Sequence, residues 1–136
     1  MNKILIVHTS WYEEYISKMI NISEEILVQK FECHKAKAPG AIELASLARN
    51  KMIKEEYIGI LFLGIIIRGQ TSHYDLITNE TFRSIGFLAE NFSNISIINN
   101  VICVENENQL NERIVKNTTN NSNSLISLVN EKSSKF

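Results

Sequence analysis

The sequence is short of cysteine, of net charge and of long apolar runs, and each shortage excludes a class of protein. Its two cysteines, Cys33 and Cys103, fit no disulfide or metal-ligand spacing, so we expect reduced structural thiols, no bound metal and a cytoplasmic protein. The net charge of -1, without a dominant basic patch, argues against a nucleic-acid partner. No apolar run reaches the roughly 20 residues that a membrane helix needs, which argues against a membrane protein.

The chain does have enough apolar residues to build a core. Hydrophobic residues make up 44% of its 136 residues and charged residues 21%. This balance is typical of a folded globular protein. The length fits one domain, which we expect to span residues 1–136.

Apolar runs and helical patterns alternate along the chain. Strands are expected at residues 3–9, 31–38, 57–67 and 95–104, and helices at about residues 12–30, 41–56 and 73–91. After the fourth strand, residues 106–116 and 124–132 predict two further helices, separated by the polar tract 117–124. The run 57–67 is apolar on both faces, whereas the run 31–38 ends at Pro39 and Gly40 and is typical of an edge strand.

This alternation predicts an α/β protein. We expect a flavodoxin-like three-layer α/β/α sandwich around a four-stranded parallel sheet, in strand order 2-1-3-4. In such sheets, ligands bind beyond the carboxyl ends of the strands.

The stretch GIIIRGQTSHYD, residues 64–75, places polar groups at one of these strand ends. Gly69 permits a sharp turn with positive φ, and Thr71 and Ser72 are candidate N-caps of the next helix. The N–H groups of that helix start favour an anion such as phosphate, and His73 can transfer protons near neutral pH. The alternative interpretation is a capped helix with a surface histidine.

Three stretches together resemble the lumazine synthase family. They are GIIIRGQTSHYDLITNE, APGAIELA at residues 38–45 and NQLNERI at residues 108–114, and the resemblance is collinear from about residue 3 to residue 128. It implies an enzyme of riboflavin biosynthesis that joins 5-amino-6-(ribitylamino)uracil to 3,4-dihydroxy-2-butanone 4-phosphate without a cofactor. The product is 6,7-dimethyl-8-ribityllumazine, and holding the two substrates in the right orientation supplies much of the rate.

The resemblance also implies residue roles around the phosphate. His73 matches the family's proton-transferring histidine. Gly69, Gln70 and Thr71 match the turn whose backbone meets the phosphate. Arg113 matches an arginine that a neighbouring subunit sends to the phosphate, and an arginine can grip phosphate bidentately.

The other implied roles concern the ribityl pyrimidine. Ile66 and Ile67 match the strand end whose main chain contacts the pyrimidine edge, and Trp11 stands where the family has an aromatic ring that stacks on the pyrimidine. The family's ribityl-binding segment corresponds to Ala41, Ile42 and Glu43. Other interpretations remain open: Trp11 as a core residue, Glu43 as a helix-start acid and Arg113 as a solvated helix residue.

The chain departs from the family pattern at two positions that matter. Asn99 stands where the family has an aromatic residue that reaches a neighbour's ligand, and Asn121 stands where it has a lysine near the phosphate. These departures favour the alternative function, a non-catalytic homologue that binds riboflavin or a related ribityl heterocycle. The resemblance further implies a homopentamer with sites at subunit interfaces. Some family members pack pentamers into a larger shell, but the short segment before the first strand favours the pentamer here.

Overall fold

All four strands run parallel in one sheet, in the order β2-β1-β3-β4. The structure is a computed structural model that describes residues 1–135. The strands are β1 (Lys3–Thr9), β2 (Glu32–Ala38), β3 (Gly59–Ile67) and β4 (Ser96–Val104). The predicted fold class and strand order are therefore confirmed, with 31–38 as an edge strand.

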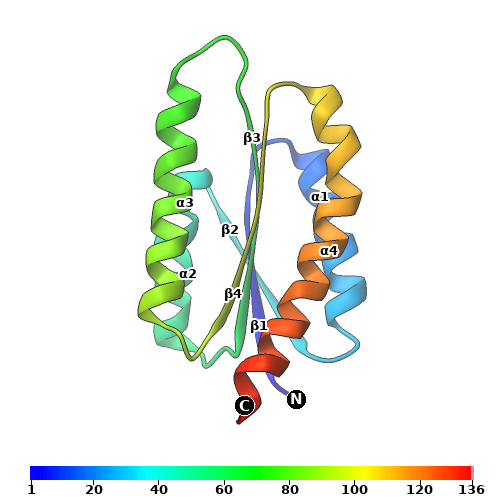
Figure 1. The fold of residues 1–136 in the computed structure, drawn as a ribbon, viewed down its shortest axis with the longest axis vertical. Helices are drawn as coiled ribbons and strands as arrows, with labels where there is room; N and C mark the ends of the chain where they lie inside the picture. Colours follow the sequence, from blue (N-terminus) through cyan, green and yellow to red (C-terminus); the bar gives the residue numbers. More distant parts are fainter. Residues whose placement is uncertain (136) are drawn as a thin grey trace.

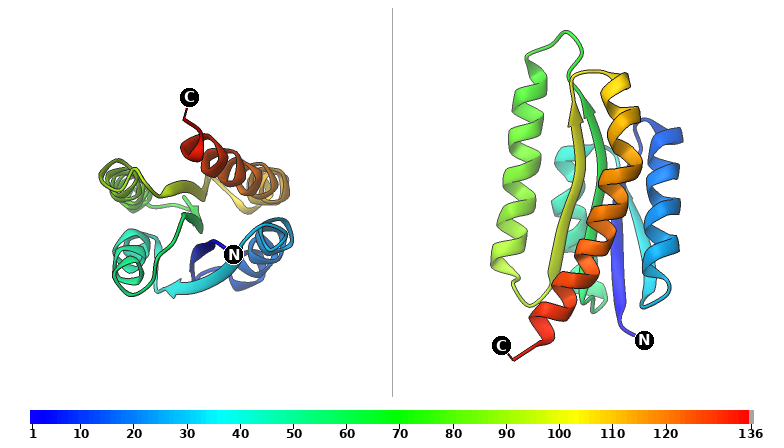
Figure 2. Two further views of the ribbon diagram at one scale, coloured as in Figure 1. Left: turned by 90° about the horizontal axis from the view of Figure 1, so that it is seen from below. Right: turned by 45° about the vertical axis from the view of Figure 1, so that its right-hand side comes forward.

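Helices cover both faces of the sheet. Helices α1 (Glu13–Leu27) and α4 (Glu107–Ser133) pack on one face, and η1 (Ala41–Glu43), α2 (Leu44–Lys54) and α3 (His73–Asn91) lie on the other (Figures 1 and 2). The three layers follow from the connections, because each crossover between parallel strands must carry a helix over the sheet.

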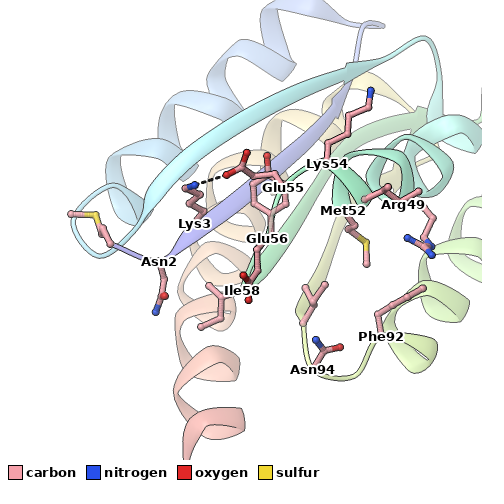
Figure 3. A pocket seen from close by; sticks show the side chains of 14 residues that line it. Asn2, Lys3, Arg49, Met52, Lys54, Glu55, Glu56, Ile58, Phe92 and Asn94 are labelled. Atoms are coloured by element: carbon pink, nitrogen blue, oxygen red, sulfur yellow. Dashed lines mark hydrogen bonds and ion pairs between the residues drawn. The ribbon is translucent and has the colours of Figure 1, made fainter.

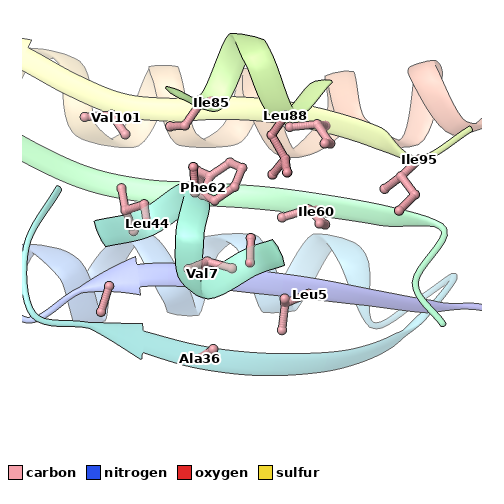
Figure 4. Packing of buried hydrophobic residues seen from close by; sticks show 14 of the residues in the cluster. Leu5, Val7, Ala36, Leu44, Ile60, Phe62, Ile85, Leu88, Ile95 and Val101 are labelled. Carbon is pink, nitrogen blue, oxygen red and sulfur yellow. The ribbon is translucent and has the colours of Figure 1, made fainter. Parts of the chain in front are cut away.

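The alternation of side chains along each strand divides the core into two clusters. Leu5 of β1 and Phe62 of β3 point toward α2 and α3 (Figure 4), whereas Ile4 and Leu61 point toward α1 and α4. Strand β3 is buried along nearly its whole length because it is central and covered on both faces. This explains why its sequence is continuously apolar instead of alternating.

The prediction of two helices after the fourth strand was wrong, because α4 is one continuous helix from Glu107 to Ser133. Its buried residues recur at helical spacing through the polar tract: Leu110, Ile114, Thr118, Ser122, Leu125 and Val129. The small hydroxyl residues in this stripe find partners on other elements. Thr118 accepts a hydrogen bond from Asn100 of β4 (3.0 Å), and Ser122 donates one to Ser23 of α1 (3.1 Å).

The expected helix over residues 41–56 also begins differently. Residues Ala41–Glu43 form a 3₁₀ turn, closed by a hydrogen bond from the N–H of Glu43 to the carbonyl of Gly40 (3.3 Å), and the α-helix starts at Leu44. This tight turn holds Ala41, Ile42 and Glu43 beside the end of β2 and does not continue the helix axis.

No helix within residues 1–135 combines the length and the apolar character needed to span a membrane. All four strands end toward the upper part of the sheet in Figure 1, with the turn after β3 rising above the ends of β1 and β2. The functional site was expected at this edge.

Candidate functional site

A pocket of about 310 Å³ lies at the carboxyl edge of the sheet. Its walls come from the turns after β1 and β2, from the end of β3 and from α3. The lining residues are Thr9, Trp11, Tyr12, Gly40, Ala41, Ile42, Glu43, Ile65, Ile66, Ile67 and Ile77. The structure therefore brings together, in one pocket, the residues that the resemblance assigned to the ribityl pyrimidine.

The turn after β1 presents an aromatic side chain to this pocket. Trp11 is 68% exposed, so it is not the core residue of the alternative interpretation. The next residue, Tyr12, has φ 59°, a left-handed conformation that ends the strand direction abruptly and starts α1. The Ser10 hydroxyl donates to the carbonyl of Pro39 (2.9 Å), which ties this turn to the end of β2.

The 3₁₀ turn after β2 supplies the pocket's carboxylate. Glu43 is half-buried, and its Oε1 lies 3.0 Å from the point that a Cβ would occupy at residue 40. A side chain at Gly40 would press against this carboxylate, so the glycine permits the observed position of Glu43. Ala41 and Ile42 complete this wall.

The end of β3 forms the apolar floor, and Arg68 anchors the chain just beyond it. The Arg68 N–H donates to the carbonyl of Val104 (2.9 Å), and its guanidinium lies 3.7 Å from a carboxylate oxygen of Glu105 and 5.7 Å from the ring centre of Tyr74. Burial raises the pKa of the Tyr74 phenol, which therefore stays neutral at physiological pH. These contacts agree with a structural role for Arg68.

The next turn leads directly into α3. Gly69 has φ 60°, a conformation that a side chain would strain. Ser72 occupies the N-cap position but its side chain makes no capping bond, whereas the Thr71 hydroxyl accepts from the N–H of His73 (3.1 Å). Gln70, like the rest of this turn, is exposed to solvent.

His73 stands in the first turn of α3 and is exposed. Residues four apart lie on the same face of a helix, so His73 lies one turn above Ile77, which lines the pocket. The N-terminus of α3 also carries partial positive charge from its peptide dipoles. His73 and the anion-favouring start of α3 therefore lie one helical turn before the pocket-lining Ile77.

Gly69, Gln70, Thr71 and His73 do not line the pocket, and the remaining two predicted residues lie on other elements. Asn99 lies in the middle of β4, where its side-chain oxygen accepts from the N–H of Val101 (2.8 Å). Arg113 lies on α4, on the other face of the sheet, and is exposed. No ion pair of Arg113 occurs among residues 1–135.

Asn121, at the position of the family's lysine, has a partner inside the protein. Its side-chain amide donates to the side-chain oxygen of Asn100 (2.6 Å), while the amide of Asn100 donates to Thr118. Asn121 lies near the middle of α4 and is half-buried. It takes part in packing α4 against β4.

Sequence reasoning missed five lining residues: Thr9, Tyr12, Gly40, Ile65 and Ile77. Thr9 carried a usable signal, because it is a polar residue at the end of a buried strand. Ile77 was detectable only through its spacing of four from His73. Within residues 1–135, no group of three or more His, Cys, Asp or Glu side chains could hold a metal ion.

A larger pocket of about 760 Å³ lies at the opposite, amino-terminal edge of the sheet (Figure 3). It contains none of the predicted site residues. Two of its cations already have partners in the chain: Lys3 pairs with Glu55, and the Arg49 guanidinium lies 4.5 Å from the ring centre of Phe92. We therefore assign the candidate site to the carboxyl edge.

Comparisons with known proteins identify the family of this chain. The family model described as 6,7-dimethyl-8-ribityllumazine synthase matches residues 1–132. A protein of that name from Neisseria gonorrhoeae (strain NCCP11945) is 33% identical over 116 residues, covering 82% of this chain and 73% of its own. Another, from Novosphingobium aromaticivorans, is 29% identical over 110 residues, covering 80% and 78%. The chain therefore belongs to the 6,7-dimethyl-8-ribityllumazine synthase family of transferases.

Proposed function

We propose that the protein condenses 5-amino-6-(ribitylamino)uracil with 3,4-dihydroxy-2-butanone 4-phosphate to form 6,7-dimethyl-8-ribityllumazine, with release of phosphate and water. The observation that carries the proposal is an apolar pocket whose lining includes Ile67, just before the Gly69 turn, and Ile77, one helical turn after His73. A flat heterocycle needs an apolar slot, and a phosphorylated partner needs an anion site directly beside it.

The pocket would hold the ribityl pyrimidine between two surfaces. Its ring would lie against the end of β3, where Ile66 and Ile67 offer main-chain groups, with the exposed ring of Trp11 covering the other side. Its ribityl chain would extend toward Ala41, Ile42 and Glu43 of the 3₁₀ turn. A carboxylate accepts hydrogen bonds readily from such hydroxyl groups.

The phosphate of the second substrate would sit at the turn formed by Gly69, Gln70 and Thr71. The backbone N–H groups and the dipole of α3 favour a negative charge there. His73, in the first turn of the same helix, is then close to the carbon atoms that exchange protons. Imine formation, phosphate elimination and ring closure each need such proton movement.

The proposed site is completed by a second chain. Arg113 and Asn99 both lie away from the pocket of their own chain, and β4 is an edge strand open to a neighbour. Helix α3 exposes Leu76, Phe82 and Phe87 at 68%, 46% and 60%, respectively. An oligomer would bury these side chains, and we propose a homopentamer in which Arg113 of one subunit reaches the phosphate held by the next. Light scattering at micromolar concentration tests the assembly, and a monomer would contradict it.

The activity is tested by incubating the protein with both substrates and following lumazine fluorescence. We expect product from the wild type, and a rate lower by about 10²- to 10⁴-fold in His73→Ala if proton transfer limits turnover. Ser72→Ala is the matched control, because Ser72 is adjacent and exposed but its side chain makes no capping bond. A folded wild-type protein that binds riboflavin but forms no product would refute the proposal in favour of a non-catalytic binding protein.

A further inference from the structure

The hydroxyl group of Thr9 lacks a hydrogen-bond partner although it is buried. Thr9 is 2% exposed, and its Oγ1 has no partner within residues 1–135. Such an arrangement is unfavourable, because a buried polar group without a partner has lost its bonds to water. Two other buried hydroxyls, those of Thr78 and Thr81 on α3, share this property, but of the three only Thr9 lines the pocket.

The position of Thr9 separates the roles of its two side-chain groups, the Cγ2 methyl and the Oγ1 hydroxyl. Its methyl carbon Cγ2 lies 3.4 Å from the point that a Cβ would occupy at Gly64, in the same packing layer as Leu44 and Val101. The methyl group thus makes the core contact. The hydroxyl branches from the same Cβ in a different direction, so it takes no part in that contact.

Thr9 also lies on a defined side of the pocket. It pairs with Ala38 at the end of β2, two residues before Gly40, against which the carboxylate of Glu43 rests. Thr9 and Glu43 therefore provide polar side chains on the β1–β2 side, whereas Ile65, Ile66 and Ile67 make the β3 side apolar. A ligand with one flat ring and one hydroxylated chain matches this division.

We propose that Thr9 Oγ1 forms a hydrogen bond with a hydroxyl group of the ligand's polyhydroxylated chain, alongside Glu43. This assignment rests on the proposed function, since it takes the ligand to be a ribityl heterocycle. A hydroxyl group both donates and accepts, so it can pair with a chain hydroxyl in either sense. Binding then satisfies a group that the ligand-free protein leaves unpaired.

The test compares two variants and two ligands. Thr9→Val keeps the shape of the side chain but removes the hydroxyl, and Thr9→Ser keeps the hydroxyl. The ligands are 6,7-dimethyl-8-ribityllumazine and 6,7,8-trimethyllumazine, which has the same ring but a methyl group in place of the ribityl chain. Dissociation constants are measured by fluorescence titration, and thermal unfolding of the ligand-free proteins is measured in parallel.

We expect Thr9→Val to bind the ribityl compound about tenfold more weakly and the trimethyl compound unchanged. Thr9→Ser should bind both ligands nearly as the wild type does. The ligand-free Thr9→Val protein should unfold at the same temperature as the wild type or higher, because it no longer buries an unpaired hydroxyl. A purely structural role for Thr9 would instead lower the unfolding temperature.

Three outcomes would overturn the inference. Thr9→Val could bind the ribityl compound as tightly as the wild type, could lose affinity for both compounds equally, or could lose affinity only together with stability. The wild type serves to separate this inference from the proposed function. If the wild type binds neither compound, the proposed function and the inference both fail; if it favours the ribityl compound and Thr9→Val favours it equally, the inference alone fails.

Discussion

Chains carrying Arg113→Ala and chains carrying His73→Ala should restore one another's activity when they assemble into the same ring. The reason lies in the position of the two side chains. His73 stands in the first turn of α3, one turn before the pocket-lining Ile77, whereas Arg113 is on α4, on the opposite face of the sheet. In the proposed pentamer, each site takes His73 from one subunit and Arg113 from the next.

The expected size of the effect follows from this geometry. Loss of a charge-assisted contact to phosphate costs about 1.5–3 kcal/mol, so Arg113→Ala alone should lower kcat/KM by about 10- to 150-fold. In rings formed from equal amounts of both variants, about a quarter of the interfaces pair an intact His73 with an intact Arg113. Co-assembled rings should therefore recover about a quarter of the wild-type activity.

The assay follows lumazine fluorescence after the two variants are unfolded and refolded together in equal amounts. Variants refolded separately and then mixed should stay at the mean of their individual activities, unless subunits exchange. Lys116→Ala is the matched control, because Lys116 is also exposed on α4 and lies three residues from Arg113. Co-assembled rings whose activity does not exceed the mean would refute the shared site. If Lys116→Ala lowered kcat/KM as much as Arg113→Ala does, the phosphate contact would not be specific to Arg113.

Three further changes test local features. Gly69→Ala places a side chain at φ 60° and should lower the free energy of unfolding by about 1 kcal/mol and raise KM for the phosphorylated substrate. Gly86→Ala, at an exposed helical position with open space, should instead raise the free energy of unfolding by about 0.5–1 kcal/mol, as measured by thermal unfolding. Equal effects of the two substitutions would contradict the role of the turn. Asn121→Ala removes the hydrogen-bond donor to the side-chain oxygen of buried Asn100, and should lower the free energy of urea unfolding by about 1–3 kcal/mol. An unchanged free energy of unfolding would show that this hydrogen bond does not stabilise the protein. Burial raises the pKa of the Cys33 thiol to about 11, so iodoacetamide should label it slowly at pH 8 and faster with each rise in pH, and labelling at the rate of the urea-unfolded chain would contradict this.

Local sequence determined the elements and much of the pocket. Strand β1 and helix α3 have the predicted bounds, because their apolar periodicity and their flanking turn residues agree with their tertiary environment. The segments that line the pocket lie at strand ends, and strand ends are visible in sequence as places where an apolar run stops. The strand ends predicted the edge at which the site lies, and the family resemblance assigned Trp11, Glu43 and Ile66 to it.

Helix α4 could not be predicted in this way, because its continuity depends on partners from other parts of the chain. Thr118, Asn121 and Ser122 read as a polar loop when they are considered alone. In the folded protein they face Asn100 of β4 and Ser23 of α1, and these partners make a buried polar stripe stable.

The sequence by itself determined the family, the strand order and the residue types at the carboxyl edge, because those follow from periodicity and from short motifs. Tertiary structure alone decided which side chains share the pocket and which hydroxyl is left without a partner. It separates Arg113 from the pocket of its own chain by the thickness of the sheet, and it encloses Thr9 among Leu44, Gly64 and Val101. Burial and hydrogen bonding are properties of packed surfaces, and residues distant in the sequence contribute to each of them.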